Sequence, residues 1–433
     1  ALMAGLLTVS ASAQGLIRDA EIERTLRMLS KPVFRGAGVS PGSVKLYLIG
    51  DRSLNAFVAG GRNIFLYSGL ISRLDKPEQL QAVLAHELGH INGGHLARRG
   101  IEARQATGAL ALGILLAIAA GVAGSPDASA AIASGTGSML QRGFLAYTRG
   151  EEASADQAGL TYLERAGINP HGFVEVLEIF RGQEALAAGR IDPFARTHPM
   201  SADRILLAER RVAASPYRDR RTPARLAYWY GRMRAKLDGF LDRPERTLRT
   251  LKPGADDEFS LIRQAVALHR LPDPDGALRA VDRLLAKRPR DAYYHELKGQ
   301  ILFESGRVPE AIAAYRRAVR LAPGESLIRA SLAEALLSLD RPKANAEALR
   351  LLKKATAADE GNARALRSLA VAWARAGNEG MAALATAERF ALERRFHDMT
   401  IHARRAAQML PRGSPGWLKA QDIILMGERL EKG

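Results

Sequence analysis

The feature that most constrains this chain is the pentapeptide His-Glu-Leu-Gly-His at residues 86–90. Four residues advance about 400° along an α-helix, so the rings of His86 and His90 project from one face and can hold the same metal ion. Glu87 lies beside that face, where its carboxylate can take a proton from an attacking water. Zinc is the ion expected for such a pair. Pro77 and the apolar spacing after it predict the helix.

A third ligand has to come from another helix, and the acidic stretch at 149–167 offers three candidates. Glu152 and Asp156 are four residues apart and share a face. One of them can bind the metal while the other accepts a hydrogen bond from the outer nitrogen of a ligand histidine. Glu151 is rotated by about 100° from Glu152, so we expect it to face solvent.

His95 invites comparison with the motif HExxHxxGxxH, but the spacing excludes it. That motif needs its third histidine at position 96, which is Leu96 here. His95 also lies nine residues after His86, about half a turn round a continuing helix. We therefore expect His95 to point away from the metal and not to bind it.

Upstream of the helix the pattern changes to strands. Residues 44–50 alternate like a strand, and the apolar runs on either side of residues 60–63 predict a hairpin. An edge strand beside a metal can pair with an extended peptide, and Asn55, Ala56 and Phe57 are the candidates for that strand. A hairpin that only packs under the helices is the alternative.

The first thirteen residues have the features of a secretory signal remnant, with an apolar run that ends in Ala11-Ser12-Ala13. Cysteine is absent from the 433 residues, which excludes disulfides, thiolate ligands and a lipid-modified cysteine. We therefore expect a periplasmic protein that is not a lipoprotein. An ordinary apolar N-terminal segment is the alternative to a signal remnant.

Residues 108–124 form an uncharged run of mostly Gly, Ala, Leu and Ile. The run is shorter than the roughly 20 residues that span a bilayer. A single crossing would also leave His90 and Glu152 on opposite sides of the membrane. We expect a hairpin packed over the active-site cleft, with peripheral membrane contact as the alternative and a true span as the weakest one.

The net charge of +17 lies almost wholly in the second half of the chain. Residues 1–200 hold 19 Lys and Arg against 17 Asp and Glu, whereas residues 201–433 hold 44 against 29. A solvated helical surface explains most such charge, and anionic lipid or acidic protein segments are alternatives. The export signal and the lack of a recognisable binding module argue against nucleic acid.

From about residue 260 the sequence is typical of helix pairs. Pro289 and Pro323 are 34 residues apart, which is one tetratricopeptide repeat, and Ala277 precedes Ala311 by the same interval. Roughly four repeats fit, and later copies are looser. Such pairs stack into a superhelix whose concave face binds peptides or other proteins.

These patterns predict a mainly α chain of the α+β class. We expect the signal remnant at 1–13, a metallopeptidase domain with a small β-hairpin sheet at 14–215, a helical linker at 216–259 and an α/α tetratricopeptide-type superhelix at 260–433.

Three motifs together resemble a known family: HELGH, then Arg149-x-x-Glu152-x-x-Ala155-Asp156, then the run from His198 to Arg204. In this order and spacing they are similar to the HtpX-type gluzincin metallopeptidases, and specifically to their periplasmic, repeat-bearing BepA-like branch. The resemblance covers nearly the whole chain. It implies one zinc ion per chain, with His86, His90 and Glu152 as ligands, Glu87 as general base, and Asp156 and Arg204 beside the ligands.

The resemblance also implies a function. Members of this branch are expected to be endopeptidases that act on misfolded or misassembled outer-membrane proteins. The repeat domain would recruit unfolded substrates and contact the outer-membrane assembly machinery. The alternative is a periplasmic chaperone or assembly adaptor with latent proteolysis.

His198 has three interpretations on sequence grounds. It can be a packing or capping histidine, since a lone histidine is seldom a ligand. It can also fill the open fourth position of the metal and keep the enzyme latent, or swing aside and stabilise the oxyanion of the transition state. We favour the latent state, because an exported protease among unfolded clients benefits from being off by default.

Overall fold

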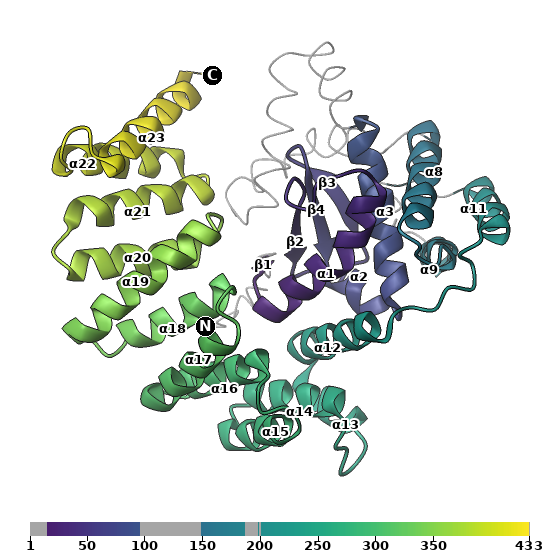
Figure 1. Cartoon of the computed structure of the whole chain (residues 1–433), viewed down its shortest axis with the longest axis horizontal. Helices are drawn as coiled ribbons and strands as arrows, with labels where there is room; N and C mark the ends of the chain where they lie inside the picture. The colour runs from purple at the N-terminus through teal and green to yellow at the C-terminus, as the bar shows by residue number, and fades with distance from the viewer. Residues whose placement is uncertain (1–14, 96–148, 187–197, 199–200, 433) are drawn as a thin grey trace, which may run out of the picture. The chain divides into compact units, whose positions relative to one another are not determined.

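The computed structural model describes residues 15–95, 149–186, 198 and 201–432 (Figure 1). The chain divides into two compact units, residues 1–17 with 26–227 and residues 18–25 with 228–433. The predicted signal remnant and the uncharged run at 108–124 lie outside the described residues. Within the part that the structure describes, no helix combines the length and apolar character needed to cross a bilayer.

The first unit contains a small sheet of four described strands in the order β1-β2-β4-β3. The strands are β1 (Leu16–Ile17), β2 (Lys45–Ile49), β3 (Ala56–Ala59) and β4 (Asn63–Tyr67). β2 runs parallel to β4, and the other two pairings are antiparallel. Gly60 and Gly61 both take positive φ, at 57° and 90°, so the β3–β4 turn suits glycine and the predicted hairpin is confirmed.

The first described elements differ from what the sequence periodicity predicts, which is a helix over 16–32 that ends at Pro32. Instead, β1 takes the first two of these residues, and α1 runs from Ala20 to Gly36 with Pro32 inside it. A proline in a helix removes one backbone hydrogen bond. Val33 and Phe34 are fully buried, and their packing offsets that loss and keeps the last turn helical.

Helix α3 (Pro77–Asn92) is the centre of the first unit, where it packs against β3, α8 (Arg149–Arg165) and α9 (His171–Leu186). α2 (Ser68–Arg73) and α11 (Ala202–Ala214) complete its described helices. Two glycines allow α3 and α8 to approach closely. A Cβ at Gly89 would lie 2.7 Å from the backbone oxygen of Ala155, and one at Gly159 would lie 3.1 Å from the backbone nitrogen of His86. The Gly of HELGH therefore brings α8 within reach of the two histidines.

The second unit is helical throughout its described residues. After α12 (Ala224–Leu241) and α13 (Pro244–Thr250) come five helix pairs, one more than the sequence predicts. They are α14 (Glu258–Arg270) with α15 (Pro274–Lys287), α16 (Ala292–Glu304) with α17 (Val308–Leu321), α18 (Ser326–Leu337) with α19 (Pro342–Ala358), α20 (Ala363–Arg375) with α21 (Glu379–Leu392), and α22 (Phe396–Met409) with α23 (Pro415–Lys432).

The tetratricopeptide spacing has a visible packing reason. A Cβ at Gly299 on α16 would lie 2.7 Å from the ring of Tyr315 on α17, so a glycine is needed there for the aromatic ring to seat. Tyr315 is itself buried in the core of the repeats. The mainly helical architecture, with a small sheet and C-terminal helix pairs, is as predicted.

Candidate metal centre

The helix that carries HELGH has a well-defined start. Pro77 occupies its first turn, where a missing N–H costs nothing, and Gln79 Oε1 accepts hydrogen bonds from the backbone N–H groups of Asp75 and Lys76. This register turns His86 and His90 to the same buried side. Their Nε2 atoms lie 3.0 Å apart.

Four side chains bring their donor atoms together at this point: His86, His90, Glu152 and His198. His86 Nε2 lies 3.2 Å from His198 Nδ1. Glu152 Oε1 lies 3.0 Å from His198 Nδ1 and 3.3 Å from His90 Nε2. Ligands about 2.0–2.1 Å from a tetrahedral ion stand roughly 3.3 Å apart. The donor set therefore has the spacing of a tetrahedral metal site.

The tautomer of His86 is fixed by its outer nitrogen. His86 Nδ1 lies 2.9 Å from Asp156 Oδ1, and because an ionised carboxylate only accepts, Nδ1 carries the proton. In the neutral ring that a metal requires, the lone pair of His86 Nε2 points into the donor cluster. Two hydrogen bonds from Arg204 to Asp156, at 2.7 and 2.8 Å, hold that carboxylate in place. Arg204 Nη1 also lies 2.8 Å from Glu152 Oε2.

Electrostatics favour the ligand forms of Asp156, Glu152 and His90. Burial lowers the pKa of His86, but its hydrogen bond with Asp156 and the nearby carboxylates outweigh burial and raise that pKa. Burial opposes ionisation of Asp156, but hydrogen bonds from Arg204 and His86 outweigh it and lower the pKa of Asp156. Burial likewise opposes ionisation of Glu152, yet His198, through its charge and its hydrogen bond, holds the pKa of Glu152 well below its usual range. Burial lowers the pKa of His90 to about 2, so this histidine is neutral, as a metal ligand must be.

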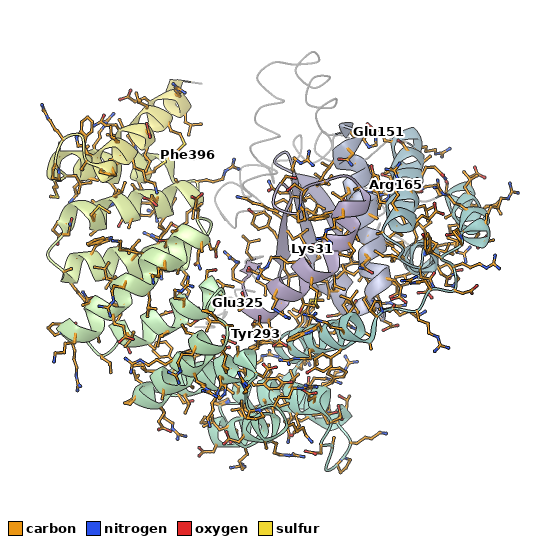
Figure 2. The ribbon with its side chains drawn as sticks, viewed as in Figure 1. Lys31, Glu151, Arg165, Tyr293, Glu325 and Phe396 are labelled. Carbon is orange, nitrogen blue, oxygen red and sulfur yellow. The ribbon has the colours of Figure 1, made fainter. Side chains whose placement is uncertain are left out.

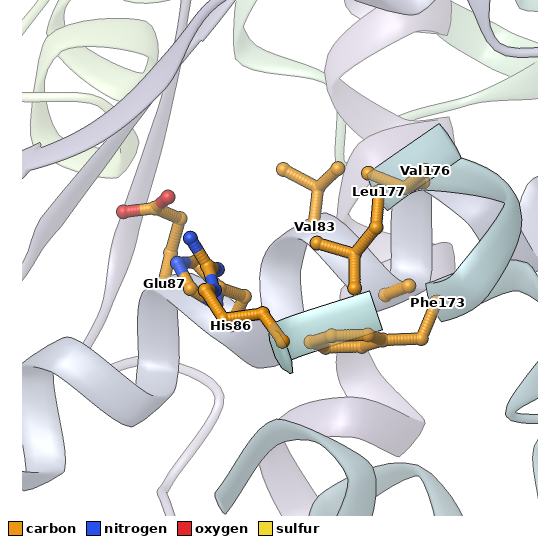
Figure 3. A pocket seen from close by; sticks show the side chains of 8 residues that line it. Val83, His86, Glu87, Phe173, Val176 and Leu177 are labelled. Atoms are coloured by element: carbon orange, nitrogen blue, oxygen red, sulfur yellow. The ribbon is translucent and has the colours of Figure 1, made fainter. Parts of the chain in front are cut away.

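Glu87 is fully buried, next to His86 on the same helix (Figure 3). No described residue gives either of its carboxylate oxygens a hydrogen bond, and His198 Nε2 lies 3.5 Å from Glu87 Oε1. Burial raises the pKa of Glu87, which suits a group that takes a proton in one step and returns it in the next. Figure 3 shows its carboxylate pointing away from the apolar side chains of Val83, Phe173 and Leu177.

Glu151 and Glu152 differ as the helical register predicts. Glu152 is fully buried in the donor cluster, whereas Glu151 is partly exposed at the start of α8 (Figure 2). The structure thus brings Glu152, four residues before Asp156, to the histidines, and not Glu151.

The candidate substrate strand lies beside the metal helix but outside the donor cluster. Ala56 and Phe57 belong to β3, which forms one edge of the described sheet and packs against α3. The side chains of Asn55, Ala56 and Phe57 are buried, and Phe57 stacks on Phe65 with ring centres 5.1 Å apart. Any peptide contact would therefore use the strand's backbone, and the substrate role stays a prediction.

The expectation that His95 points away from the metal-binding histidines was wrong. His95 is buried, and its Nδ1 lies 2.9 Å from His90 Nδ1. The expectation assumed that the helix continues, but α3 ends at Asn92 and Gly94 takes a φ of 65°. The consecutive glycines at 93 and 94 are the signal in the sequence that could have predicted this turn.

Comparisons with known proteins agree with this architecture. Residues 17–212 match the model of peptidase family M48, and residues 262–326 match a tetratricopeptide repeat model. The beta-barrel assembly-enhancing protease of Yersinia pestis is 28% identical over 384 residues, which cover 87% of this chain and 77% of that protein. The protein of the same name in Escherichia coli (strain K12) is 28% identical over 394 residues, 88% of this chain and 78% of its own length. Metalloprotease LoiP of Escherichia coli (strain K12) is 28% identical over 196 residues, 45% of this chain and 73% of its own.

Proposed function

We propose that this metallopeptidase, whose residues 17–212 match peptidase family M48, is a zinc-dependent endopeptidase of the bacterial periplasm. Its substrates would be misfolded or misassembled outer-membrane proteins. Tetratricopeptide repeats follow the peptidase domain. The observation that carries the proposal is the buried donor cluster with Glu87 beside it. The names of the relatives, which describe proteases that enhance beta-barrel assembly, support the choice of substrate class.

Zinc is the ion that this donor set suits best. The chain offers imidazole nitrogens and one carboxylate, with no thiolate, at separations close to the edges of a tetrahedron. Divalent calcium and magnesium prefer six or more oxygen ligands, which the cluster does not supply. His86, His90 and Glu152 would hold the ion, and it would polarise the scissile carbonyl and activate a water.

The residues of the chain then divide the remaining work. Glu87 takes the proton of the attacking water, keeps it in its buried position, and delivers it to the leaving amine. Asp156, fixed by Arg204, orients the ring of His86. The backbone of β3 pairs with an extended peptide, so that the scissile bond lies along the helix face of HELGH.

His198 gives the enzyme a latent state in this proposal. Its Nδ1 lies within the donor cluster, 3.0 Å from Glu152 Oε1, where it would complete four protein ligands. Catalytic zinc sites usually keep one position open for water or substrate. His198 therefore has to withdraw before a substrate carbonyl can enter.

The repeat unit would recruit clients. Helix pairs of this type present a continuous surface to peptides, and the relatives that cover most of this chain carry names that refer to beta-barrel assembly. Unfolded outer-membrane proteins in transit, and the machinery that assembles them, are the partners we expect. A chaperone with latent proteolysis is the alternative that the next experiment separates.

Cleavage of an unfolded protein such as casein by wild type and Glu87→Gln tests the proposal. The substitution keeps the ligands and removes the base, so we expect zinc to remain at about one ion per chain and hydrolysis to fall by orders of magnitude. Glu178→Gln, at an exposed position on α9, is the matched control and should leave both unchanged. Equal cleavage by Glu87→Gln and wild type would refute the peptidase mechanism.

A further inference from the structure

The two histidines of HELGH are supported at their outer nitrogens by different partners. His86 Nδ1 lies 2.9 Å from the carboxylate of Asp156, which the resemblance predicts. His90 Nδ1 lies 2.9 Å from His95 Nδ1, which nothing in the mechanism uses. Both partners are buried, at 2% and 3% exposure, so water does not replace either contact.

The chain reaches this contact through a turn that favours glycine at residues 93 and 94. Gly93 closes α3 by donating to the backbone oxygen of Gly89 at 2.8 Å, and Gly94 then reverses the chain with a φ of 65°. The ring of His95 folds back over residue 93, where a Cβ would lie 2.4 Å from its Nε2. The local backbone is therefore shaped to place this ring against His90.

We propose that His95 is a positioning residue for His90, which it holds in the tautomer that presents Nε2 to the metal. The inference rests on the proposed metal site. Two Nδ1 atoms 2.9 Å apart need one donor and one acceptor. His90 Nε2 faces the donor cluster, 3.0 Å from His86 Nε2 and 3.3 Å from Glu152 Oε1.

A neutral imidazole whose Nε2 carries the lone pair has its proton on Nδ1. His90 therefore donates, and His95 Nδ1 accepts. In the reverse arrangement, His95 would donate to His90 Nδ1 and place an N–H of His90 among the metal donors. That arrangement would block a ligand atom, so the polarity of this single hydrogen bond decides whether His90 can bind.

Three variants separate positioning from packing. His95→Phe keeps a ring of similar size without an acceptor, and His95→Asn keeps an acceptor oxygen near the position of Nδ1. His171→Phe, at an exposed histidine of α9, is the matched control. Nitrogen NMR of the histidine rings reports the His90 tautomer in metal-free protein, and competition with a chromophoric chelator reports zinc affinity.

In metal-free wild type we expect His90 to carry its proton on Nδ1. His95→Phe should weaken zinc binding by about 10- to 100-fold, the usual effect of losing such a partner. His95→Asn should restore most of the affinity, and His171→Phe should resemble wild type. Circular dichroism checks that each variant is folded.

Three results would overturn the inference. The first is a wild-type His90 protonated on Nε2, which needs no variant and no metal. The second is a folded His95→Phe with wild-type zinc affinity. The third is an Asn variant as weak as the Phe variant, which would indicate packing alone. A wild type that binds no zinc would refute the proposed function instead, and the tautomer would still decide the role of His95.

Discussion

The described residues bury charge in two places, and the two clusters differ in kind. The metal centre lies in the first unit. The second cluster lies in the other unit, where Arg232 and Lys236 of α12 are almost fully buried. Arg232 Nε lies 2.6 Å from Glu21 Oε1, and Lys236 Nζ lies 2.7 Å from Asp19 Oδ2. Each cation of the second cluster is in contact with carboxylates of its own unit.

In the metal centre, by contrast, nitrogen atoms face one another instead of each facing a partner of opposite charge. The Nε2 atoms of His86 and His90 face each other at 3.0 Å, and His198 Nδ1 adds a third nitrogen at 3.2 Å from His86. When the ring of His86 is neutral, its proton lies on Nδ1, which donates to Asp156, and Nε2 presents a lone pair. Lone pairs that converge in a buried site repel unless a cation joins them. Buried charge alone therefore does not mark a functional site; convergence of acceptors does.

We expect the largest effect when one acceptor of the metal centre is removed. Glu152→Ala should reduce zinc affinity and cleavage by orders of magnitude, because it deletes a ligand and leaves Arg204 without one of its buried carboxylates. Glu151→Ala is the neighbour control and should change little. Metal content after dialysis and cleavage rate measure both. A Glu151 variant that loses the metal while the Glu152 variant keeps it would contradict the helical register.

The register of the site was predictable because it is local. The four-residue spacing within HELGH and between Glu152 and Asp156 fixes which side chains share a helix face, without reference to the rest of the fold. The position of His95 was not predictable from periodicity, because it depends on a left-handed glycine that ends the helix. Helical spacing describes a helix only as far as its last turn.

The second cluster shows a different limit. The basic half of the chain predicts a solvated helical surface, yet Arg232 and Lys236 are buried. Their partners Asp19 and Glu21 stand about two hundred positions earlier in the chain. No local pattern reveals a pairing at that separation, since it arises only when the folded chain brings the segments together. The network had to be seen in the structure.

Breaking the second cluster should destabilise the protein without touching the metal. Arg232→Met leaves Glu21 and Asp291 buried without their guanidinium, which should lower the free energy of unfolding by about 3–5 kcal/mol. Zinc affinity should stay at the wild-type value. Urea unfolding and chelator competition measure the two quantities, and Arg249→Met on the exposed side of α13 is the control. A loss of zinc affinity in folded Arg232→Met would show that the clusters are coupled.

A smaller effect tests the fourth donor of the metal centre. His198→Ala should raise cleavage, with zinc retained by the three remaining ligands, because in our proposal His198 holds the latent state. The gain is about tenfold if the latent form holds about 90% of the molecules. Steady-state cleavage with metal analysis measures it. A lower rate with zinc retained would favour the oxyanion role, and an unchanged rate would leave only packing.

The smallest expected effect concerns how much a carboxylate with partners in its own unit contributes to the free energy of unfolding. Glu258, at the start of α14, accepts hydrogen bonds from Tyr228, Tyr294 and Arg288 at 2.8, 2.7 and 2.6 Å. Burial opposes its ionisation, but the bond from Arg288, followed by those from the two tyrosines, outweighs burial and lowers the pKa of Glu258. A carboxyl with a lowered pKa stabilises the fold above its unfolded pKa and loses that contribution as the pH falls through its folded pKa.

Glu258→Gln keeps the size and one acceptor oxygen but removes the charge. It should lower the free energy of unfolding by about 1 kcal/mol at neutral pH, and the difference from wild type should vanish at an acidic pH below the lowered pKa of Glu258, where the wild-type side chain is protonated. Urea midpoints at the two pH values measure this, with Glu245→Gln, an exposed glutamate of α13, as control. A difference of equal size at both pH values would assign the loss to altered packing. A difference confined to neutral pH would show that side chains of the repeat unit stabilise this charge by themselves. The converging acceptors of the metal centre, in contrast, need a bound cation.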